Sequence, residues 1–200
     1  MGGFSGRLGN VVVYEMFGKT VVRSLPQKNQ KKATGKRKQY QDDFRYVMKW
    51  MQYLKPMIDK CWLPEPPHQK AFKPAFSHHL KRYREMDRPN KLEWIQLTKG
   101  GLEGFGNTEM YFDGELLQLK WSNVRIEEPS NLRDTVYIQL TNPTKGRAHE
   151  HLIATERQDG RKEIAVSSWE KGDRIVAFMV AASSNNPGLF SKTYCVEISN

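Results

Sequence analysis

The stretch GDRIVAFMVA, residues 172–181, is the part of this sequence that decides its fold class. Every side chain from Ile175 to Ala181 is apolar, and turn residues flank the run at 172–173 and 185–188. A continuous apolar run of about four to eight residues between turn signals is typical of a buried strand. We therefore expect 175–181 to be the central strand of a β-sheet.

Strand and turn patterns continue on both sides of this run, from residue 108 to residue 200. Apolar residues alternate around Leu119 and around Ile138, and turn residues recur at 113–114, 142–143 and 159–160. About seven short strands at spacings of roughly 8–15 residues are typical of an immunoglobulin-like sandwich. We therefore expect residues 108–200 to form a seven-stranded immunoglobulin-like β-sandwich.

The preceding region shows a helical period. Apolar residues at spacings of three and four run from Phe44 to Ile58, and they predict a helix that starts at Tyr40. Pro56 is expected to kink or end this helix, because its ring opposes a backbone carbonyl in the previous turn. A second helix is expected to begin near Pro74, a residue suited to a first helical turn.

A change to a period of two follows the second helix. Residues 94–97 predict a strand, and the glycine-rich stretch 98–106 predicts a hinge between two modules. The predicted fold class is therefore α+β, with a basic hairpin and two-helix module at 1–107 and the β-sandwich at 108–200.

The N-terminal region predicts a β-hairpin. Two runs of strand-forming residues, 11–14 and 20–22, flank a turn at 16–19, and Gly6 and Gly9 before them are expected to act as hinges. Because an isolated hairpin is marginally stable in water, this one is expected to pack on a neighbour. The predicted docking residues are Val11, Val13, Tyr14, Val21, Val22 and Arg23.

The charge of the chain is unevenly distributed. The net charge is +10, and it divides into +12 for residues 1–107 and −2 for residues 108–200. Residues 28–38 carry six of the positive charges and are expected to form a solvated linker. This pattern is consistent with three roles: binding of nucleic acid, binding of an acidic protein surface, or solubility alone. The predicted binding residues are Lys28, Lys31, Lys32, Lys36, Arg37, Lys38, Lys81, Arg82 and Arg84.

The histidine and glycine clusters do not predict a ligand site. His149 and His151 would share a face of a strand, but no further ligand lies nearby in the sequence, so an exposed edge strand is expected. His78 and His79 are expected on a basic helix face, since adjacent helical positions point in different directions. The glycines of 100–106 have no Lys-Ser/Thr after them, so they do not predict a phosphate-binding loop.

The acidic and thiol side chains that stand out in the sequence are not predicted to be catalytic. Asp42 and Asp43 are expected in an early helical turn, where they would complement the helix dipole. Cys61 and Cys195 are expected to be buried free thiols in a reducing compartment. The sequence therefore predicts no catalytic residues, no metal, no cofactor and no small-molecule substrate.

Two resemblances add to this interpretation. A Leu-x-Trp strand at 119–121, followed by the strand at 136–138 and the run at 172–181, resembles the fibronectin type III arrangement. The motifs Gly6-x-x-Gly9-Asn10 and Arg23-Ser24-x-Pro26 resemble the start of an uncharacterised Bacteroidota family that phages also carry. In that family a Trp usually stands at the position of Phe17. The resemblance implies architecture and supplies no catalytic residue.

These observations predict a non-enzymatic structural or adaptor protein that forms homo- or hetero-oligomers. Its basic N-terminal half would dock it into a larger assembly, such as a phage-like virion or a secretion-like particle. A nucleic-acid-binding protein is the alternative, and a carbohydrate-binding module is a weaker one. The N-terminus lacks a secretory signal and no stretch reaches the roughly 18 apolar residues of a membrane span, so synthesis in the cytosol is expected.

Overall fold

The computed structural model of this chain describes residues 5–25, 34–62, 70–113, 116–123, 132–149, 151–166, 169–170 and 172–199. The chain forms two compact units, residues 1–38 and 39–200. The predicted division at residue 107 is therefore wrong, because the helical region packs into one body with the β-rich region. We call 39–200 the body.

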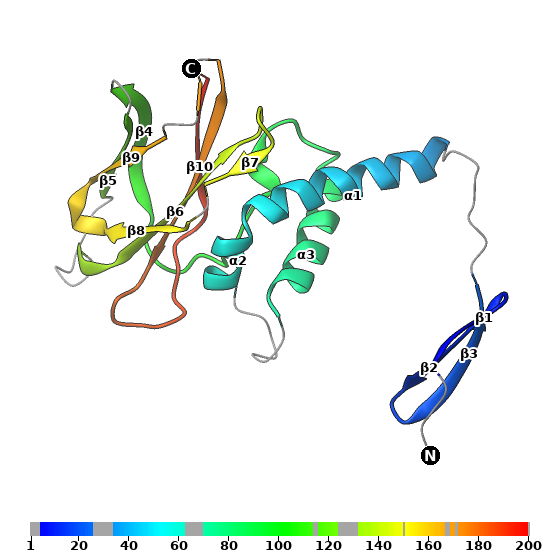
Figure 1. Ribbon diagram of the computed structural model, residues 1–200. Coiled ribbons are helices and arrows are strands. Elements are labelled where there is room, and N and C mark those ends of the chain that lie inside the picture. The colour runs from blue at the N-terminus through cyan, green and yellow to red at the C-terminus, as the bar shows by residue number, and fades with distance from the viewer. Residues whose placement is uncertain are drawn as a thin grey trace. The chain divides into compact units, whose positions relative to one another are not determined.

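The first unit contains a three-stranded antiparallel sheet in the order β1-β2-β3 (Figure 1). Its strands are β1 (Gly6–Leu8), β2 (Val11–Met16) and β3 (Lys19–Ser24). The predicted hairpin is confirmed: Phe17 and Gly18 form its turn, with φ of +52° and +71°. β1 was not predicted, because Gly6 and Gly9 were expected to be hinges. Gly6 instead pairs with Val13 in the sheet.

The helices are α1 (Gly35–Tyr53), α2 (Lys55–Cys61), α3 (Phe72–Glu85) and the short 3-10 helix η1 (Leu92–Trp94). α1 begins five residues before the predicted start, so the end of the predicted linker is helical. The break at Pro56 is confirmed, since Leu54 separates α1 from α2 and Pro56 lies in the first turn of α2. None of the helices among the described residues is both long and apolar enough to cross a membrane.

The β-rich part of the body contains two antiparallel sheets. One has the order β11-β10-β6-β7, with β8 also paired to β6, and the other has the order β4-β5-β9. Their strands are β4 (Phe105–Asp113), β5 (Leu116–Asn123), β6 (Thr135–Asn142), β7 (Arg147–Ala148), β8 (Ile153–Glu156), β9 (Arg161–Ala165), β10 (Arg174–Ala182) and β11 (Tyr194–Ser199).

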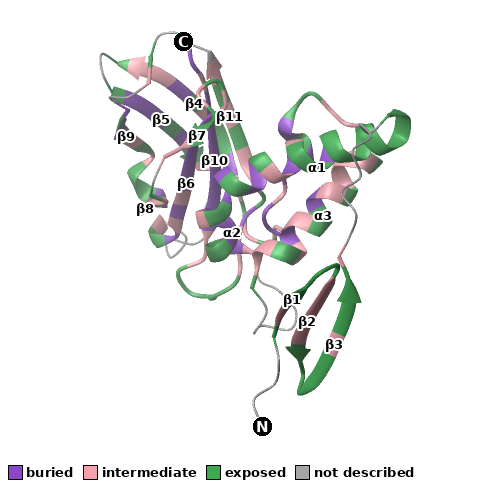
Figure 2. Ribbon diagram, turned by 45° about the vertical axis from the view of Figure 1, so that its right-hand side comes forward, coloured by how far each residue is buried: buried purple, intermediate pink, exposed green. Residues whose placement is uncertain are grey.

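β10 is the predicted central strand, and it is buried on both faces. Val176, Phe178 and Val180 point into a core shared with the helices. The residues between them, such as Ala177 and Met179, point into a second core shared with β4, β5 and β9. Figure 2 shows this burial along β6 and β10. The apolar run is continuous because neither face of the strand meets solvent.

The structure is therefore a mixed α+β fold with antiparallel sheets, as predicted. The body has three layers: helices, the larger sheet and the smaller sheet. Eight strands are present among the described residues of the β-rich part, and not the seven of the prediction. Helices cover one face of the larger sheet, whereas an immunoglobulin-like sandwich leaves its outer faces to solvent.

The segment 94–104 corrects two further predictions. Trp94 ends η1, and residues 95–98 form no strand. The glycine-rich stretch is not a hinge between modules, because its backbone packs on the loop before β11. Gly101 N–H donates to the Phe190 carbonyl at 2.9 Å, and Leu102 forms a parallel bridge with Ser191. The fully buried Arg157 donates to the carbonyls of residues 103 and 104.

Candidate functional site

The N-terminal sheet has two chemically different faces. Successive side chains of a strand alternate between faces, and directly paired residues share one. The pairs Leu8–Val11 and Val13–Val22 therefore lie on one face, which we call the aliphatic face and which also holds Glu15, Thr20 and Ser24. The opposite face, the cationic face, holds Arg7, Val12, Tyr14, Met16, Lys19, Val21 and Arg23. The six predicted docking residues are thus divided equally between two faces.

No described residue of this sheet is buried (Figure 2). Leu8 is 69% exposed, Val22 is 63% exposed and Phe17 is 92% exposed. On the cationic face the Arg23 guanidinium lies 5.5 Å from the centre of the Tyr14 ring. The sheet therefore presents apolar side chains that its own unit does not cover.

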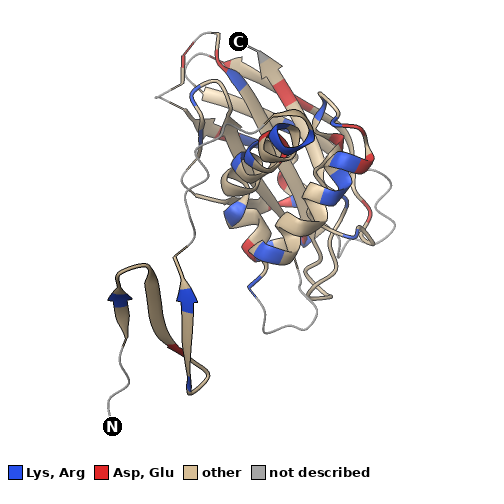
Figure 3. Cartoon of the chain, turned by 90° about the vertical axis from the view of Figure 1, so that its right-hand side faces the viewer, with Lys and Arg blue, Asp and Glu red and all other residues tan. Residues whose placement is uncertain are grey.

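The two units differ strongly in charge. Residues 1–38 contain nine Lys/Arg and one Asp/Glu, a net charge of +8, whereas the 162 residues of the body contain 23 and 21, a net charge of +2. Figure 3 shows Lys and Arg on the strands of the N-terminal sheet and along the helices of the body. The basic character therefore belongs mainly to the first unit and not to the whole predicted half at 1–107.

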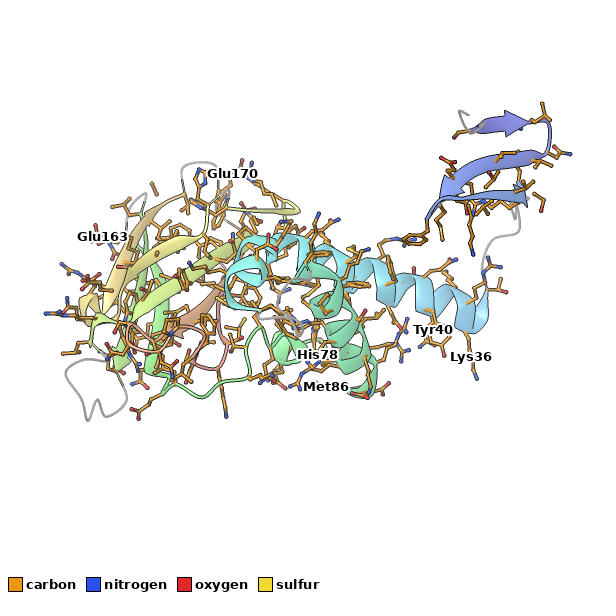
Figure 4. The ribbon with its side chains drawn as sticks, turned by 90° about the horizontal axis from the view of Figure 1, so that it is seen from below. Lys36, Tyr40, His78, Met86, Glu163 and Glu170 are labelled. Carbon is orange, nitrogen blue, oxygen red and sulfur yellow. The ribbon has the colours of Figure 1, made fainter. Side chains whose placement is uncertain are left out.

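The predicted basic linker is only partly described. Lys28, Lys31 and Lys32 lie outside the described residues. Lys36, Arg37 and Lys38 occupy the first turns of α1 and are exposed, and the Lys36 side chain projects from the helix in Figure 4. These three cations are available to a partner, but on a helix and not in an extended linker.

The predicted basic residues of α3 have contacts within the body. Arg84 donates from Nε to Asp43 Oδ2 at 3.1 Å, and its guanidinium lies 4.7 Å from the centre of the Tyr40 ring. Lys81 lies 3.7 Å from Glu85. Arg82 is half-buried, and its Nη2 lies 3.5 Å from the Glu93 carbonyl. The three residues do not form an open cationic face, although their binding role stays a prediction.

Asp43 has a structural role that the sequence did not indicate. The buried carboxylate accepts hydrogen bonds from Arg84 and Arg88 and so fastens α1 to α3 and the turn after it. Burial alone would raise the pKa of Asp43, but the hydrogen bonds and charges of Arg88 and Arg84 outweigh burial, so the pKa lies below its ordinary value. The expected interaction with the helix dipole is wrong, since α1 begins eight residues earlier.

The histidine clusters also differ from expectation. His149 and His151 lie between β7 and β8 and not within a strand, and His149 Nδ1 lies 3.0 Å from the His151 carbonyl. Among the described residues no group of three potential metal ligands occurs. The structure therefore shows a contact between the imidazole of His149 and the backbone carbonyl of His151.

His79 is fully buried and does not belong to a basic helix face. Its Nε2 accepts a hydrogen bond from Gln96 N–H at 3.2 Å, so its Nδ1–H donates to the Ala75 carbonyl at 2.7 Å. Burial lowers the pKa of His79 to about 4. The neighbouring His78 also has a pKa below its ordinary value, because partial burial and the charge of Arg82 disfavour its imidazolium form.

A groove of about 700 Å³ lies in the body between α2, α3, the segment 96–101 and the loop before β11. Trp62, Leu97, Leu189 and Phe190 supply apolar walls, and Arg82 lies among the lining side chains. No sequence signal indicated this groove, because its walls come from segments up to about 130 residues apart along the chain.

Both cysteines are free thiols, as expected. Cys61 is buried beside the groove, and burial raises the pKa of its thiol to about 12. It is therefore not an activated nucleophile. Cys195 is exposed on β11, so the prediction that it is buried is wrong.

No protein-family model and no curated protein matches this chain. Among solved structures, it is similar to the spore cortex lytic enzyme SleM of Clostridium perfringens. The match has 16% sequence identity and a TM-score of 0.36, and it covers 48% of this chain and 27% of that chain. A likeness this low supports no statement about activity, and less than a third of the enzyme is matched.

Proposed function

We propose that this protein is a non-enzymatic structural or adaptor protein that docks into a larger assembly through the aliphatic face of its N-terminal sheet. The observation that carries this proposal is that the sheet buries none of its described residues, although Leu8 and Val22 are aliphatic and more than half exposed. A small sheet without a core is marginally stable. Covering its apolar surface contributes about 25 cal/mol per Å².

The turn of the sheet supports the same proposal. Phe17 is held at φ +52°, a conformation that costs a residue with a side chain roughly 1–2 kcal/mol. Its ring is 92% exposed, so contacts within the unit do not offset this cost. An aromatic side chain in this position gains most of its contacts when a neighbouring molecule covers the turn.

The net charge of the first unit indicates which class of molecule the docking partner belongs to. The first unit carries +8, so two copies that met sheet to sheet would bring like charges together. An acidic surface of another protein would instead be attracted by the net charge of the unit. We therefore propose an acidic protein as the docking partner.

Site-specific photo-cross-linking in the cells that make the protein tests this. A photoreactive phenylalanine analogue replaces Val22 on the aliphatic face, and the control replaces Glu163, an exposed residue of β9 labelled in Figure 4. We expect discrete adducts with acidic proteins from position 22 and none from position 163. The double variant Val13→Thr/Val22→Thr keeps the strand propensity and should lower association about tenfold.

Two results would contradict docking. Equal adducts at both positions would mean that contact with position 22 is nonspecific. Slow hydrogen exchange of the β2 and β3 amides in a dilute monomer would mean that the sheet is covered by its own chain. Light scattering of the full chain and of the double variant shows in addition whether the neighbour is a second copy.

Nucleic-acid binding is the second candidate, and the cationic face favours it. Arg7, Lys19 and Arg23 share this face with Tyr14, and phosphate-binding cations beside an aromatic ring suit single strands. A titration at two salt concentrations tests it. Arg7→Gln/Arg23→Gln should lower the salt dependence by about two phosphate contacts, whereas Val13→Thr/Val22→Thr should not.

The body would be the rigid part of such an adaptor. Two antiparallel sheets enclose one core, which supports an immunoglobulin-like relationship for β4–β11 as part of this proposal. Association with a phage-like or secretion-like particle stays a prediction. Cross-linked partners identified from position 22 would also reveal that setting.

A further inference from the structure

The groove beside α3 contains an arginine whose charge is not used by the fold. Arg84 and the nearby Arg88 share the carboxylate of Asp43. Arg82, two residues before Arg84, lines the groove and has no ion pair among the described residues. Its buried Nε has no hydrogen-bond partner there, and its Nη2 contact with the Glu93 carbonyl is long at 3.5 Å. A half-buried guanidinium without an ion pair would gain from an anion at its terminal nitrogens, since Nε itself is not exposed.

The other lining residues fit an anion with an apolar body. The described lining includes Arg82, His78 and Lys99 and no Asp or Glu. Trp62, whose ring centre lies 5.3 Å from that of His78, and Leu189 supply apolar surface in the same groove. A volume of about 700 Å³ lies within the roughly 300–1,000 Å³ of small-molecule sites. The groove is therefore apolar in its walls and positive in charge.

Two glycines shape one wall of the groove. A Cβ atom at Gly101 would lie 2.9 Å from Leu189 Cδ1, and one at Gly100 would lie 2.6 Å from Lys192 Cγ. Gly100 also has φ +69°, which disfavours other residues. These glycines allow segment 96–101 to lie close to the loop before β11. The glycine-rich stretch thus helps to form the groove and does not act as a hinge.

We propose that this groove binds a small organic carboxylate, with the carboxylate at Arg82 and a flat apolar body against Trp62 and Leu189. This site lies wholly within the body and does not depend on the proposed docking function. The carboxylate would accept hydrogen bonds from the Arg82 guanidinium, and the body of the ligand would remove the indole face of Trp62 from water.

An NMR titration of the ¹⁵N-labelled full chain tests the proposal with indole-3-acetate and its neutral amide, indole-3-acetamide. These probes match in shape and differ in charge. We expect saturable shifts of the Gly100, Gly101 and Gly188 amides, and binding of the carboxylate about tenfold or more tighter than that of the amide. Arg82→Gln should remove this preference. Lys81→Gln, an exposed neighbour on the same helix, should leave it unchanged.

Three results would overturn the proposal. Absence of saturable shifts up to millimolar carboxylate would show that the groove binds no such ligand. Equal affinity for the carboxylate and the amide would show that Arg82 does not recognise charge. Shifts confined to Gly9 and Gly18 would show nonspecific attraction to the basic N-terminal sheet. The carboxylate and the amide are both compared on the unsubstituted chain. This comparison therefore tests the proposal even if Arg82→Gln fails to fold.

Discussion

β2 and β10 are both rich in β-branched and apolar residues, yet they lie in opposite environments. β10 carries fully buried side chains on both faces, whereas β2 carries none that is buried. Every buried residue among those described lies at Asp43 or later. The comparison teaches that a sequence of strand-forming residues determines a strand, while the elements that cover it determine whether it contributes to a core.

The net charge also differs between the body and the first unit. The body, with helices on one face of its larger sheet and a second sheet on the other, is almost neutral at +2. The first unit combines +8 with an uncovered sheet. The body has buried cores of its own, whereas the N-terminal sheet buries none of its described residues, and we propose that it docks on an acidic surface. Four measurements test this difference, from the largest expected effect to the smallest.

Two phenylalanines give the most direct comparison. Phe178 of β10 is fully buried against Trp50, and Phe17 in the turn of the N-terminal sheet is 92% exposed. Phe178→Ala should lower the free energy of unfolding of the body by about 3–5 kcal/mol, because it removes core contacts and leaves a cavity. Phe17→Ala should change it by less than about 0.5 kcal/mol. Urea unfolding followed by tryptophan fluorescence measures both, and similar losses would contradict the division of the chain.

Acid should destabilise the body through His79. Its pKa is about 4 in the folded chain and about 6.5 when unfolded, so the unfolded state binds more protons between these values. The stabilisation is complete above pH 6.5 and falls by about 3 kcal/mol as the pH decreases to 4. Urea midpoints across this range measure it. His79→Leu should weaken this dependence and lower stability at pH 7.5, and His78→Gln serves as control. An unchanged pH profile in His79→Leu would contradict the buried neutral imidazole.

Asp43 should contribute a smaller amount in a lower pH range. Its carboxylate accepts charged hydrogen bonds from Arg84 and Arg88, whose side chains are 34% and 27% exposed. Asp43→Asn should therefore lower stability by about 1–3 kcal/mol at pH 7. Because the folded pKa is depressed, the stabilisation is present above the unfolded pKa near 3.8 and is lost as the pH falls through the folded pKa. Asp42→Asn is the exposed control, and an equal effect of both variants would argue against a stabilising role of the hydrogen bonds from Arg84 and Arg88 to Asp43.

Removal of the N-terminal sheet should have the smallest effect on the body. A chain that begins at residue 26 lacks none of the buried residues, so its free energy of unfolding should stay within about 0.5 kcal/mol of the full chain. Differential scanning calorimetry of both chains measures this. A loss of more than about 1 kcal/mol would mean that the sheet packs on its own body, and the docking proposal would then lack its basis.

Much of the local structure could be predicted. The β2–β3 hairpin, the break at Pro56 and the central strand at 175–181 depend on residues close together in the sequence, and all three are confirmed. The prediction of a strand at 94–97 is wrong, because the backbone N–H groups of Gln96 and Leu97 donate to side chains and not to a neighbouring strand. Leu97 N–H donates to Thr193 Oγ1 at 2.8 Å, a contact across 96 residues that no local pattern indicates.

The candidate sites also contain some features that the sequence predicted and others that it did not. The positive charge of residues 28–38 could be predicted, because the charge of a segment follows from its residue types alone. The use of Arg84 as a partner of the buried Asp43, and the unused charge of Arg82 two residues before it, could not. Both arginines have the same local signature, and only the position of α1 beside α3 distinguishes them.

By itself, the sequence determined the charge of each segment, the turn at Phe17-Gly18 and the buried strand at 175–181, because these depend on side chains within a few positions of one another. Only the tertiary structure decided the boundary at residue 38, the helical layer on β10 and the groove at Arg82. These depend on which surfaces of distant segments meet, and that choice follows from the packing of the whole body.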